Sequence, residues 1–333
     1  MSDRIGVRMI ARAAAAVALG AMMALPLQAQ SASCMDQPLP LQDACQKAAD
    51  LFAFVAPQLS ASLAGGNATL GQTGNLGGVG HFTLGVRATG LRGELPDLSG
   101  TGVSIAGPQS ETYEVQDQWV ALPQVDLALG IFGGVPVGLT SIGGIDLLVS
   151  GSWVPEVDGD GVSVRTPEGQ FTFGYGARVG LLQETAMAPG VSVTYLRRSL
   201  PEVAVDAFVD DDSLLVGDAK LTTDSWRLVA GKNFFAFGLS AGIGQDRYDS
   251  HADVAAVVND IGGPYRTTTP ADFSQKLTRT NAFANLAMNL AVLRLVVEVG
   301  RVWGDDAPTF NSFAGTSPTE PRLYGSVGLR VGF

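Results

Sequence analysis

The chain has 333 residues, of which 16% are charged, 46% are hydrophobic and 42 are glycine. Soluble domains carry more charge (~25%) and less glycine (~7%), and a net charge of -11 without a basic stripe excludes a nucleic-acid partner. Mean hydropathy is +0.21, yet no internal run reaches the ~18 apolar residues of a membrane helix, so the apolar residues must be spread through an alternating pattern.

Residues 1–29 have the three parts of a secretory signal peptide. The charged start holds three arginines, Arg4, Arg8 and Arg12. An apolar stretch from Ala13 to Leu25 follows, and small residues surround Ala29. This order predicts a signal peptide rather than a spanning helix, with cleavage after Ala29 and export from the cytoplasm.

The two cysteines, Cys34 and Cys45, would then lie in an oxidising compartment. An even count there favours a disulfide, which would contribute ~2–3 kcal/mol locally. Free thiols are the alternative, and zinc is not expected because no histidine lies nearby. Cleavage at Ser31 or Ser33 is the alternative to cleavage after Ala29. The chain could also be a lipoprotein with Cys34 as the lipidated residue, but Ser31-Ala32-Ser33 lacks the aliphatic residue that usually stands three places before such a cysteine.

Residues 30–79 form a segment separate from the rest of the chain. Asp43 to Leu63 predicts a helix in which Pro57 is a kink or a break. Residues 65–80 contain seven glycines in sixteen positions, which indicates a flexible or tightly turning connector. We expect this segment to lie in the periplasm or to plug the mouth of the domain that follows at residues 80–333.

From His81 onward the hydrophobic pattern has a period of two, as in Phe82-Thr83-Leu84. Ten strands are predicted, at residues 82–88, 124–129, 145–153, 171–179, 191–196, 225–230, 235–246, 281–290, 293–299 and 322–333. Twelve strands are possible, because other segments could extend these strands or add a pair: Val203–Val209, or Gly102–Ala106 with Thr112–Val115.

Long polar connectors alternate with shorter ones. The long ones are residues 94–117, 156–169, 199–221, 249–273 and 304–321. This asymmetry, with an even strand count, predicts an all-β fold: a transmembrane antiparallel up-and-down β-barrel of the bacterial outer membrane. One strand face carries almost no charge, unlike the solvent face of a soluble sandwich. The four tryptophans stand near the long-loop ends, as an interfacial girdle requires: Trp119, Trp153, Trp226 and Trp303.

Several stretches of the chain carry a resemblance to known families. The ending YGSVGLRVGF resembles the C-terminal signature of outer-membrane proteins, which implies that the barrel assembly machinery recognises Phe333. Three segments are similar to a family of uncharacterised outer-membrane barrels, over roughly residues 50 to 240: LFAFVAPQLSASLAGGNATLGQTGNLGGVGHFTLGVRAT, LPQVDLALGIFGG and SWVPEV. The helix and Gly-rich segment also resemble, loosely, those of long-chain fatty-acid and hydrocarbon channels, whose N-terminal segment plugs the lumen. The chain is too short for their fourteen strands.

Charged residues on the polar strand faces are the candidate lumen lining. They are Arg87, Asp126, Asp146, Arg178, Arg227, Asp246, Arg294, Glu298 and Arg330. In a small barrel such charges either pair and fill the interior or line a solute path. Packing is the favoured option at this strand count.

Neither an enzyme nor a cofactor is expected. His251 stands beside Asp246, Asp249 and Ser250, and a hydrolytic rim site is one hypothesis, but a solvated acidic loop explains it better. His81 lies at the other end of the barrel. The acidic stretches at residues 157–161 and 209–213 lack the spacing of a full calcium loop, so no metal is predicted.

The sequence thus favours an outer-membrane barrel that passes or binds a small solute, a hydrophobic one being among the options. The alternative is a non-conducting structural or surface-interaction barrel that acts through its long loops. The expected partners are outer-membrane lipid, the assembly machinery and the solute.

Overall fold

A computed structural model describes residues 30–97, 102–159, 162–209, 212–258, 266–268, 270–290 and 292–332. Ten antiparallel strands of this part form a closed ring, which confirms the predicted up-and-down barrel. They are β1 (Phe82–Pro96), β3 (Val115–Phe132), β6 (Gly144–Trp153), β9 (Phe171–Leu182), β10 (Gly190–Ser199), β12 (Asp212–Phe234), β13 (Phe237–Val258), β15 (Ala271–Leu290), β16 (Leu293–Gly304) and β18 (Arg322–Gly332). The last strand closes the ring on the first, with Thr83 opposite Gly332 and Leu91 opposite Tyr324.

Shorter strands extend the barrel beside this ring. They are β2 (Thr112–Tyr113), β4 (Val135–Val137), β5 (Thr140–Ile142), β7 (Val157–Gly159), β8 (Val162–Arg165), β11 (Val203–Val209), β14 (Arg266–Thr267) and β17 (Ser312–Phe313). The segment Val203–Val209 is therefore a strand, as the higher count allowed, and it pairs with the beginning of β12. This end of the barrel, opposite the C-terminus, is the upper end, and the end beside the C-terminus is the lower end. Thr112–Tyr113 also forms a strand, which pairs with β17.

Strands β12 and β13 are much longer than predicted, and residues 199–221 and 249–273 are largely strand rather than loop. The cause is a reversal of polarity along the strand. The outward face of β13 begins with the exposed Phe237, Leu239 and Ile243 and continues with Arg247 and Asp249.

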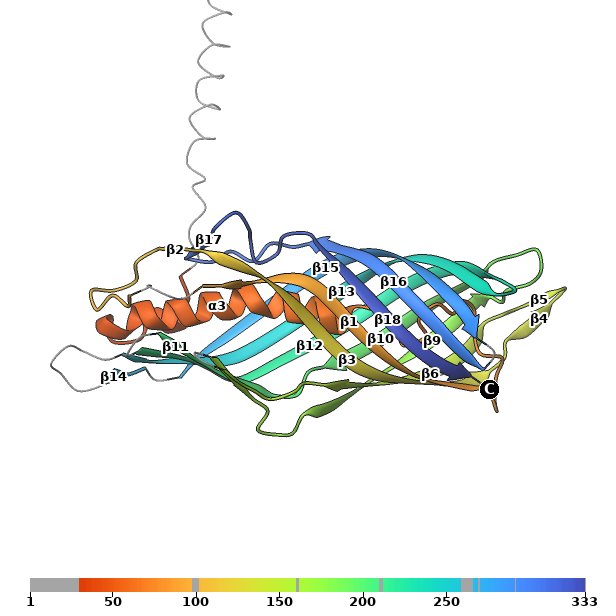
Figure 1. Ribbon diagram of the computed structural model, residues 1–333, viewed down its shortest axis with the longest axis horizontal. Helices are drawn as coiled ribbons and strands as arrows, with labels where there is room; N and C mark the ends of the chain where they lie inside the picture. The colour runs from red at the N-terminus through yellow and green to blue at the C-terminus, as the bar shows by residue number, and fades with distance from the viewer. Residues whose placement is uncertain are drawn as a thin grey trace, which may run out of the picture.

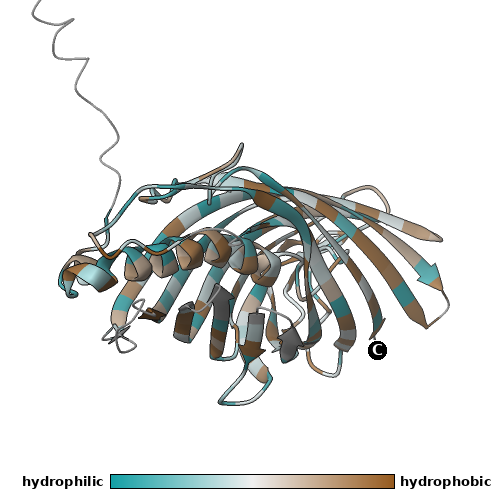
Figure 2. Ribbon diagram, turned by 60° about the vertical axis from the view of Figure 1, so that its left-hand side comes forward, coloured by the Kyte–Doolittle hydropathy of each residue, from teal (hydrophilic) through white to brown (hydrophobic). Residues whose placement is uncertain are grey.

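The inward face of β13 changes in the opposite sense, from Ser240 and Asp246 to Ala252 and Val254. The lower part of the barrel is therefore apolar outside, as contact with lipid requires. The upper part is apolar inside and charged outside, as in a soluble protein. Figure 2 shows the alternation of hydrophobic and hydrophilic residues along the strands.

Two helices precede the barrel, α2 (Ala32–Met35) and α3 (Leu39–Ala64). Figure 1 shows α3 lying lengthwise within the end of the barrel that is opposite the C-terminus. This end carries the long connectors. Of the segment predicted to plug the mouth or lie in the periplasm, the helix occupies this end of the barrel, and the Gly-rich residues after it reach the opposite mouth, where Gly71 and Gln72 contact the wall. The upper interior is apolar and therefore suits the many small and apolar side chains of α3. Among the described residues, no helix is long and apolar enough to cross a membrane.

Pro57 neither breaks nor ends the predicted helix, which runs without interruption from Leu39 to Ala64. A proline cannot donate to the carbonyl four residues earlier, here that of Ala53. The side chain of Gln275 on β15 donates to this carbonyl at 3.5 Å instead. The barrel wall thus compensates for the hydrogen bond that Pro57 removes.

The upper half of the barrel is divided into two parts. The hairpin of β1 and β3 stays paired up to Pro96 opposite Val115, but β3 pairs with β6 only as far as Gln124 opposite Ser152. Pro123, which has no N–H to donate, stands where β3 leaves β6. Helix α3 packs between this hairpin and the sheet of β12 and β13, so the helix completes the core that the open wall leaves uncovered.

Candidate functional site: the plugged lumen

The upper part of α3 is held by an apolar core. Small residues of the helix (Ala44, Ala48 and Ala49) pack with Val254 and Ala256 of β13. Further along the helix, Phe52, Ala56 and Leu63 pack with residues of β3, β12 and β13: Leu122, Leu221 and Ala252. Small side chains let the helix backbone lie close to the wall, so little space is left between them.

Two connectors clamp the outer end of the helix through carboxylates. Asp43 accepts hydrogen bonds from the backbone N–H groups of Ser104 (2.7 Å) and Gln109 (2.8 Å). Lys47 pairs with Asp43 at 3.2 Å and with Glu111 at 3.0 Å. The connector between β1 and β3 is therefore fixed on the helix by its own backbone donors.

The connector between β16 and β18 is fixed in the same manner by Asp50. This carboxylate accepts from the N–H of Phe310 (3.2 Å) and from the N–H (2.8 Å) and side-chain amide (2.7 Å) of Asn311. Burial raises the pKa of Asp50 to about 6, although these hydrogen bonds oppose the rise. Phe54 of the helix stacks on Phe313, with ring centroids 4.1 Å apart.

Above this clamp, Cys34 of α2 and Cys45 of α3 form a disulfide between residues 11 positions apart. Both cysteines are fully buried, beside Ala44 and Ala48. The disulfide ties the short α2 to the start of α3.

The inner end of α3 meets a group of buried arginines near the middle of the barrel. Arg198 of β10 donates to the carbonyls of Leu63, Ala64 and Gly66, each at 3.0 Å. Arg227 of β12 donates to the carbonyl of Ala64, and Arg87 of β1 to that of Gly65, both at 2.5 Å. The last carbonyls of a helix lack partners within it and carry partial negative charge. Three guanidinium groups of the wall thus serve as the cap of this helix.

The predicted lumen residues form ion pairs inside the ring. Arg87 pairs with Asp126 at 2.8 Å, Arg178 with Asp146 at 2.6 Å, and Arg227 with Glu298 at 3.5 Å. Two of these carboxylates also accept from the plug: Asp146 from the N–H of Leu76, and Glu298 from the N–H of Gly66, both at 3.1 Å. The same charges therefore hold the wall together and hold the N-terminal segment in place.

The other three predicted lumen residues lie apart from these pairs. Asp246 is buried and accepts from the side-chain amide of Asn281 at 2.8 Å. Arg294 and Arg330 lie lower, at the mouth beside the C-terminus, and bind the plug through the carbonyl of Gly71 (2.8 Å) and the side chain of Gln72 (3.1 Å).

Residues 65–80 continue from the helix through the lower lumen to β1. Close approach to the wall requires glycine at several points, and Gly130 is the clearest: a Cβ there would lie 2.3 Å from the carbonyl oxygen of Gly78. Asn75 fits against two other wall glycines, Gly144 and Gly180. The Gly-rich segment is thus a fitted part of the interior rather than a free linker.

Several polar atoms of the wall are buried without a hydrogen-bond partner in the described part of the chain. They include Ser192 Oγ, Ser240 Oγ, Asn281 Oδ1 and Asn285 Oδ1, on β10, β13 and β15. Buried polar atoms ordinarily bind protein groups or water, so this side of the interior is suited to hydration.

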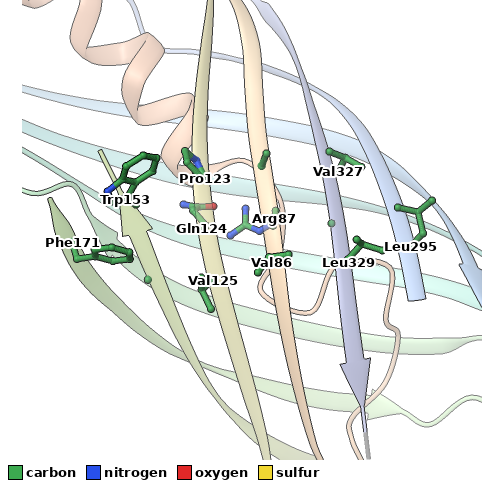
Figure 3. A pocket seen from close by; sticks show the side chains of 13 residues that line it. Val86, Arg87, Pro123, Gln124, Val125, Trp153, Phe171, Leu295, Val327 and Leu329 are labelled. Carbon is green, nitrogen blue, oxygen red and sulfur yellow. The ribbon is translucent and has the colours of Figure 1, made fainter. Parts of the chain in front are cut away.

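A hollow of the described surface lies outside the lumen (Figure 3). Its volume is about 460 Å³, and outward-facing side chains line it, including Val86, Val125, Phe171 and Leu329. The guanidinium of Arg87, at the back of this hollow, points away from it to bind Asp126. The hollow therefore belongs to the apolar outer wall.

The structure separates the residues of the hydrolytic hypothesis. His251 lies on the outer face of β13, with its Nδ1 3.3 Å from Asp272, whereas Asp246 is inside the barrel. The two acidic stretches at 157–161 and 209–213 lie partly outside the described residues, and no cluster of three potential metal ligands occurs among those described. Residues 1–29 and Phe333 also lie outside the described residues.

Sequence reasoning missed Arg198, Asp50 and Asp43. Arg198 stands beyond the predicted end of its strand, and its partners are backbone carbonyls, which no pattern of side chains reveals. The partners of Asp43 and Asp50 are backbone donors of distant connectors, which the residues of the helix do not reveal.

No family model and no curated protein matches this chain. Among solved structures, similar ones include Neisserial surface protein A, at 9% identity and a TM-score of 0.29, over 76% of this chain and 97% of that one. The translocator domain of the autotransporter NalP from Neisseria meningitidis is 11% identical, with a TM-score of 0.36, over 77% and 89%. The toluene transporter TodX of Pseudomonas putida is 10% identical, with a TM-score of 0.31, over 82% and 92%. At these scores the likeness carries no argument about function.

Proposed function

We propose that this chain is an outer-membrane barrel closed at rest by its own residues 30–80, and that it admits a small solute when the inner part of this segment moves. The observation that carries the proposal is the kind of contact that holds residues 65–80. Beyond Gly66 these contacts include hydrogen bonds from wall arginines to Gly71 and Gln72 and from the N–H of Leu76 to the carboxylate of Asp146, which water can replace. Apolar packing of this part on the wall is limited to small clusters that contain Ala68 and Leu70.

The polar interior favours a polar solute over the hydrophobic one that the sequence also allowed. The lower interior carries Arg, Asp, Asn and Ser side chains, several of them with unpartnered atoms. The apolar hollow of Figure 3 is on the outer wall, where lipid would cover it. The outer apolar band and the charged upper rim support an outer-membrane location, and residues 1–29 would direct export.

Catalysis is not part of this proposal. The histidine near acidic residues of the rim, His251, is exposed, and its Nδ1 lies 3.3 Å from the carboxylate of Asp272. Assembly of the barrel through Phe333 remains a prediction from the sequence.

A reversible crosslink tests the proposal. A Cβ on Gly180 would lie 3.1 Å from the Cβ of Asn75, slightly closer than the ~3.5–4.5 Å of a disulfide. After a shift of a few tenths of an ångström, Asn75→Cys with Gly180→Cys should form a disulfide that fixes the plug to β9. Purified protein in liposomes should pass small polar solutes in the swelling assay, lose this flux on oxidation and regain it on reduction. The wild type and Asn75→Cys alone are the matched controls.

Two outcomes contradict the proposal. Flux that continues through the fully oxidised double variant would show that the plug need not move. Absence of flux in the wild type, and also in a variant without residues 30–79, would exclude a passage of any kind.

A second function is favoured by the outer clamp. Asp43, Lys47 and Asp50 hold two connectors in fixed positions on α3, which presents an ordered outer surface. A non-conducting barrel that binds a partner there would be impermeable. Its binding would be abolished by deleting residues 102–111 while the barrel still shows heat-dependent mobility on a gel.

A further inference from the structure

The mouth beside the C-terminus holds two arginines in an arrangement that a folded protein ordinarily avoids. Arg294 of β16 and Arg330 of β18 are direct partners in the ladder between these strands. Side chains in such positions have their Cβ atoms ~4.5–5.5 Å apart, and like charges there are destabilising. The barrel contains the opposite arrangement elsewhere, where Asp146 and Arg178 are direct partners and form a buried ion pair.

Within the described residues, neither arginine has a carboxylate within ion-pair distance. Arg294 donates to the carbonyl of Gly71 at 2.8 Å and to the side chain of Asn233, and its Nε is buried without a partner. Arg330 donates to the side chain of Gln72 at 3.1 Å. The carboxylate of Glu184 binds Asn233 rather than either guanidinium group. Neutral oxygens thus satisfy some donors, while in this part of the chain no carboxylate is in direct contact with either guanidinium group.

Both arginines line a cavity of about 340 Å³ that is open to the mouth. The other polar residues of its wall are Gln72, His81, Thr83 and Asn289. These side chains supply further hydrogen-bond donors, and no acidic residue is among the described lining. The cavity has room for a group of a few heavy atoms with its own hydration.

We infer that this cavity binds a small oxyanion, a phosphate or carboxylate group, between Arg294 and Arg330. Guanidinium groups bind such groups through paired N–H donors, and rings of Arg or Lys select anions in pores. The anion balances the two like charges, which explains why the barrel tolerates them as direct partners. The site does not depend on the proposed passage, because a closed barrel would bind the anion at its mouth equally well.

Inorganic phosphate is the probe for a direct test. Purified full-length protein in detergent is titrated with phosphate by calorimetry at constant ionic strength. Saturable binding is expected, and it should weaken at least tenfold in Arg330→Gln and in Arg294→Gln. Arg330→Lys keeps the charge but loses the paired donors, and an intermediate affinity is expected for it.

Arg301→Gln is the matched control. Arg301 lies on β16 as Arg294 does, and it is exposed on the outer face, so this variant has the same net charge without a change in the cavity. Each variant is first shown to be folded by its heat-dependent mobility on a gel. Unchanged phosphate binding in both mouth variants, an equal loss in Arg301→Gln, or absence of binding in the wild type would overturn the inference, since the arginines would then be balanced from within the chain.

A lipid headgroup and a free anion share the chemistry that this cavity recognises. The same titration in nanodiscs distinguishes them. If phosphatidylglycerol nanodiscs abolish phosphate binding and phosphatidylcholine nanodiscs do not, the headgroup of an anionic lipid occupies the site. If binding persists in both, the ligand is a free oxyanion.

Discussion

Arg198 offers the sharpest test of how the barrel holds its plug. The side chain is buried, and its guanidinium donates three hydrogen bonds, two to the last carbonyls of α3 (Leu63 and Ala64) and one to that of Gly66 just beyond it. We expect Arg198→Met, which keeps an unbranched side chain of similar length, to loosen residues 56–70 while the ring stays closed. The lumen would lose one buried charge, and the helix would lose most of its cap.

The magnitude follows from the contacts. Hydrogen bonds that involve a charged group contribute ~1.5–3 kcal/mol each, and removing one partner of a buried charged interaction costs ~3–5 kcal/mol. Part of this is recovered because the arginine itself no longer has to be desolvated, and Arg87 and Arg227 still bind Gly65 and Ala64. A net loss of about 2–4 kcal/mol corresponds to a roughly 30- to 900-fold larger population of the opened segment.

Hydrogen exchange measured by mass spectrometry checks this. Amides of residues 56–70 should exchange faster by that factor, while those of β13 should not change. Arg197→Gln is the matched control, because Arg197 points to the outer face and forms a half-exposed pair with Asp224 at 3.0 Å, worth ~0–1 kcal/mol. Equal exchange in the Arg198→Met and Arg197→Gln variants would refute the role of the arginine cap.

Three further predictions concern other parts of the plug. Folding raises the pKa of Asp50 from 3.8 to about 6, so between these pH values the folded protein keeps a proton that the unfolded chain has lost. The stability that this group contributes is fully present below pH 3.8 and falls by ~3 kcal/mol as the pH rises through 6. The thermal midpoint should fall over the same pH range, and Asp50→Asn should remove this dependence. Replacing Cys34 and Cys45 together by Ser should cost about 3 kcal/mol and speed exchange only near residues 30–46; equal loosening of all of α3 would contradict this. Gly130→Ala should displace Gly78 and expose residues 74–81 to protease, whereas Gly151→Ala, whose Cβ would meet its nearest atom at 3.6 Å, should not.

The ring of ten strands could be predicted because its signal is local. Apolar and polar residues alternate within each strand, and the connectors differ in length, so no long-range information is needed. The extra length of β12 and β13 escaped prediction for a physical reason. Above Ile243 the outward residues become charged, which resembles a loop in the sequence, although the ladder between the strands continues to Val257 opposite Ser213.

The position of α3 could not be predicted from its own residues. Its small and apolar side chains suit either a periplasmic helix or a plug, and the choice depends on distant partners such as Val254 and Phe313. The inward direction of Arg87 and Asp146 follows from alternation, and both are buried in the structure. The function of these residues as anchors of the plug does not follow from alternation, since their partners are backbone groups of Gly65 and Leu76.

The two parts of the plug are held by different forces, and this decides which part can move. Helix α3 is fixed by an apolar core, a disulfide and two clamped connectors, and withdrawing it would expose apolar surface at ~25 cal/mol per Å². Residues 67–80 bind the wall through polar contacts that water can replace, such as those of Gly71 and Gln72, and through small apolar clusters that contain Ala68 and Leu70. Movement that opens the lower lumen therefore costs less if the segment bends just beyond the arginine cap at Gly66 and leaves the helix in place. Arg198 and Arg227 would then keep their hydrogen bonds to the end of α3 during the movement, and opening would not require these bonds to break.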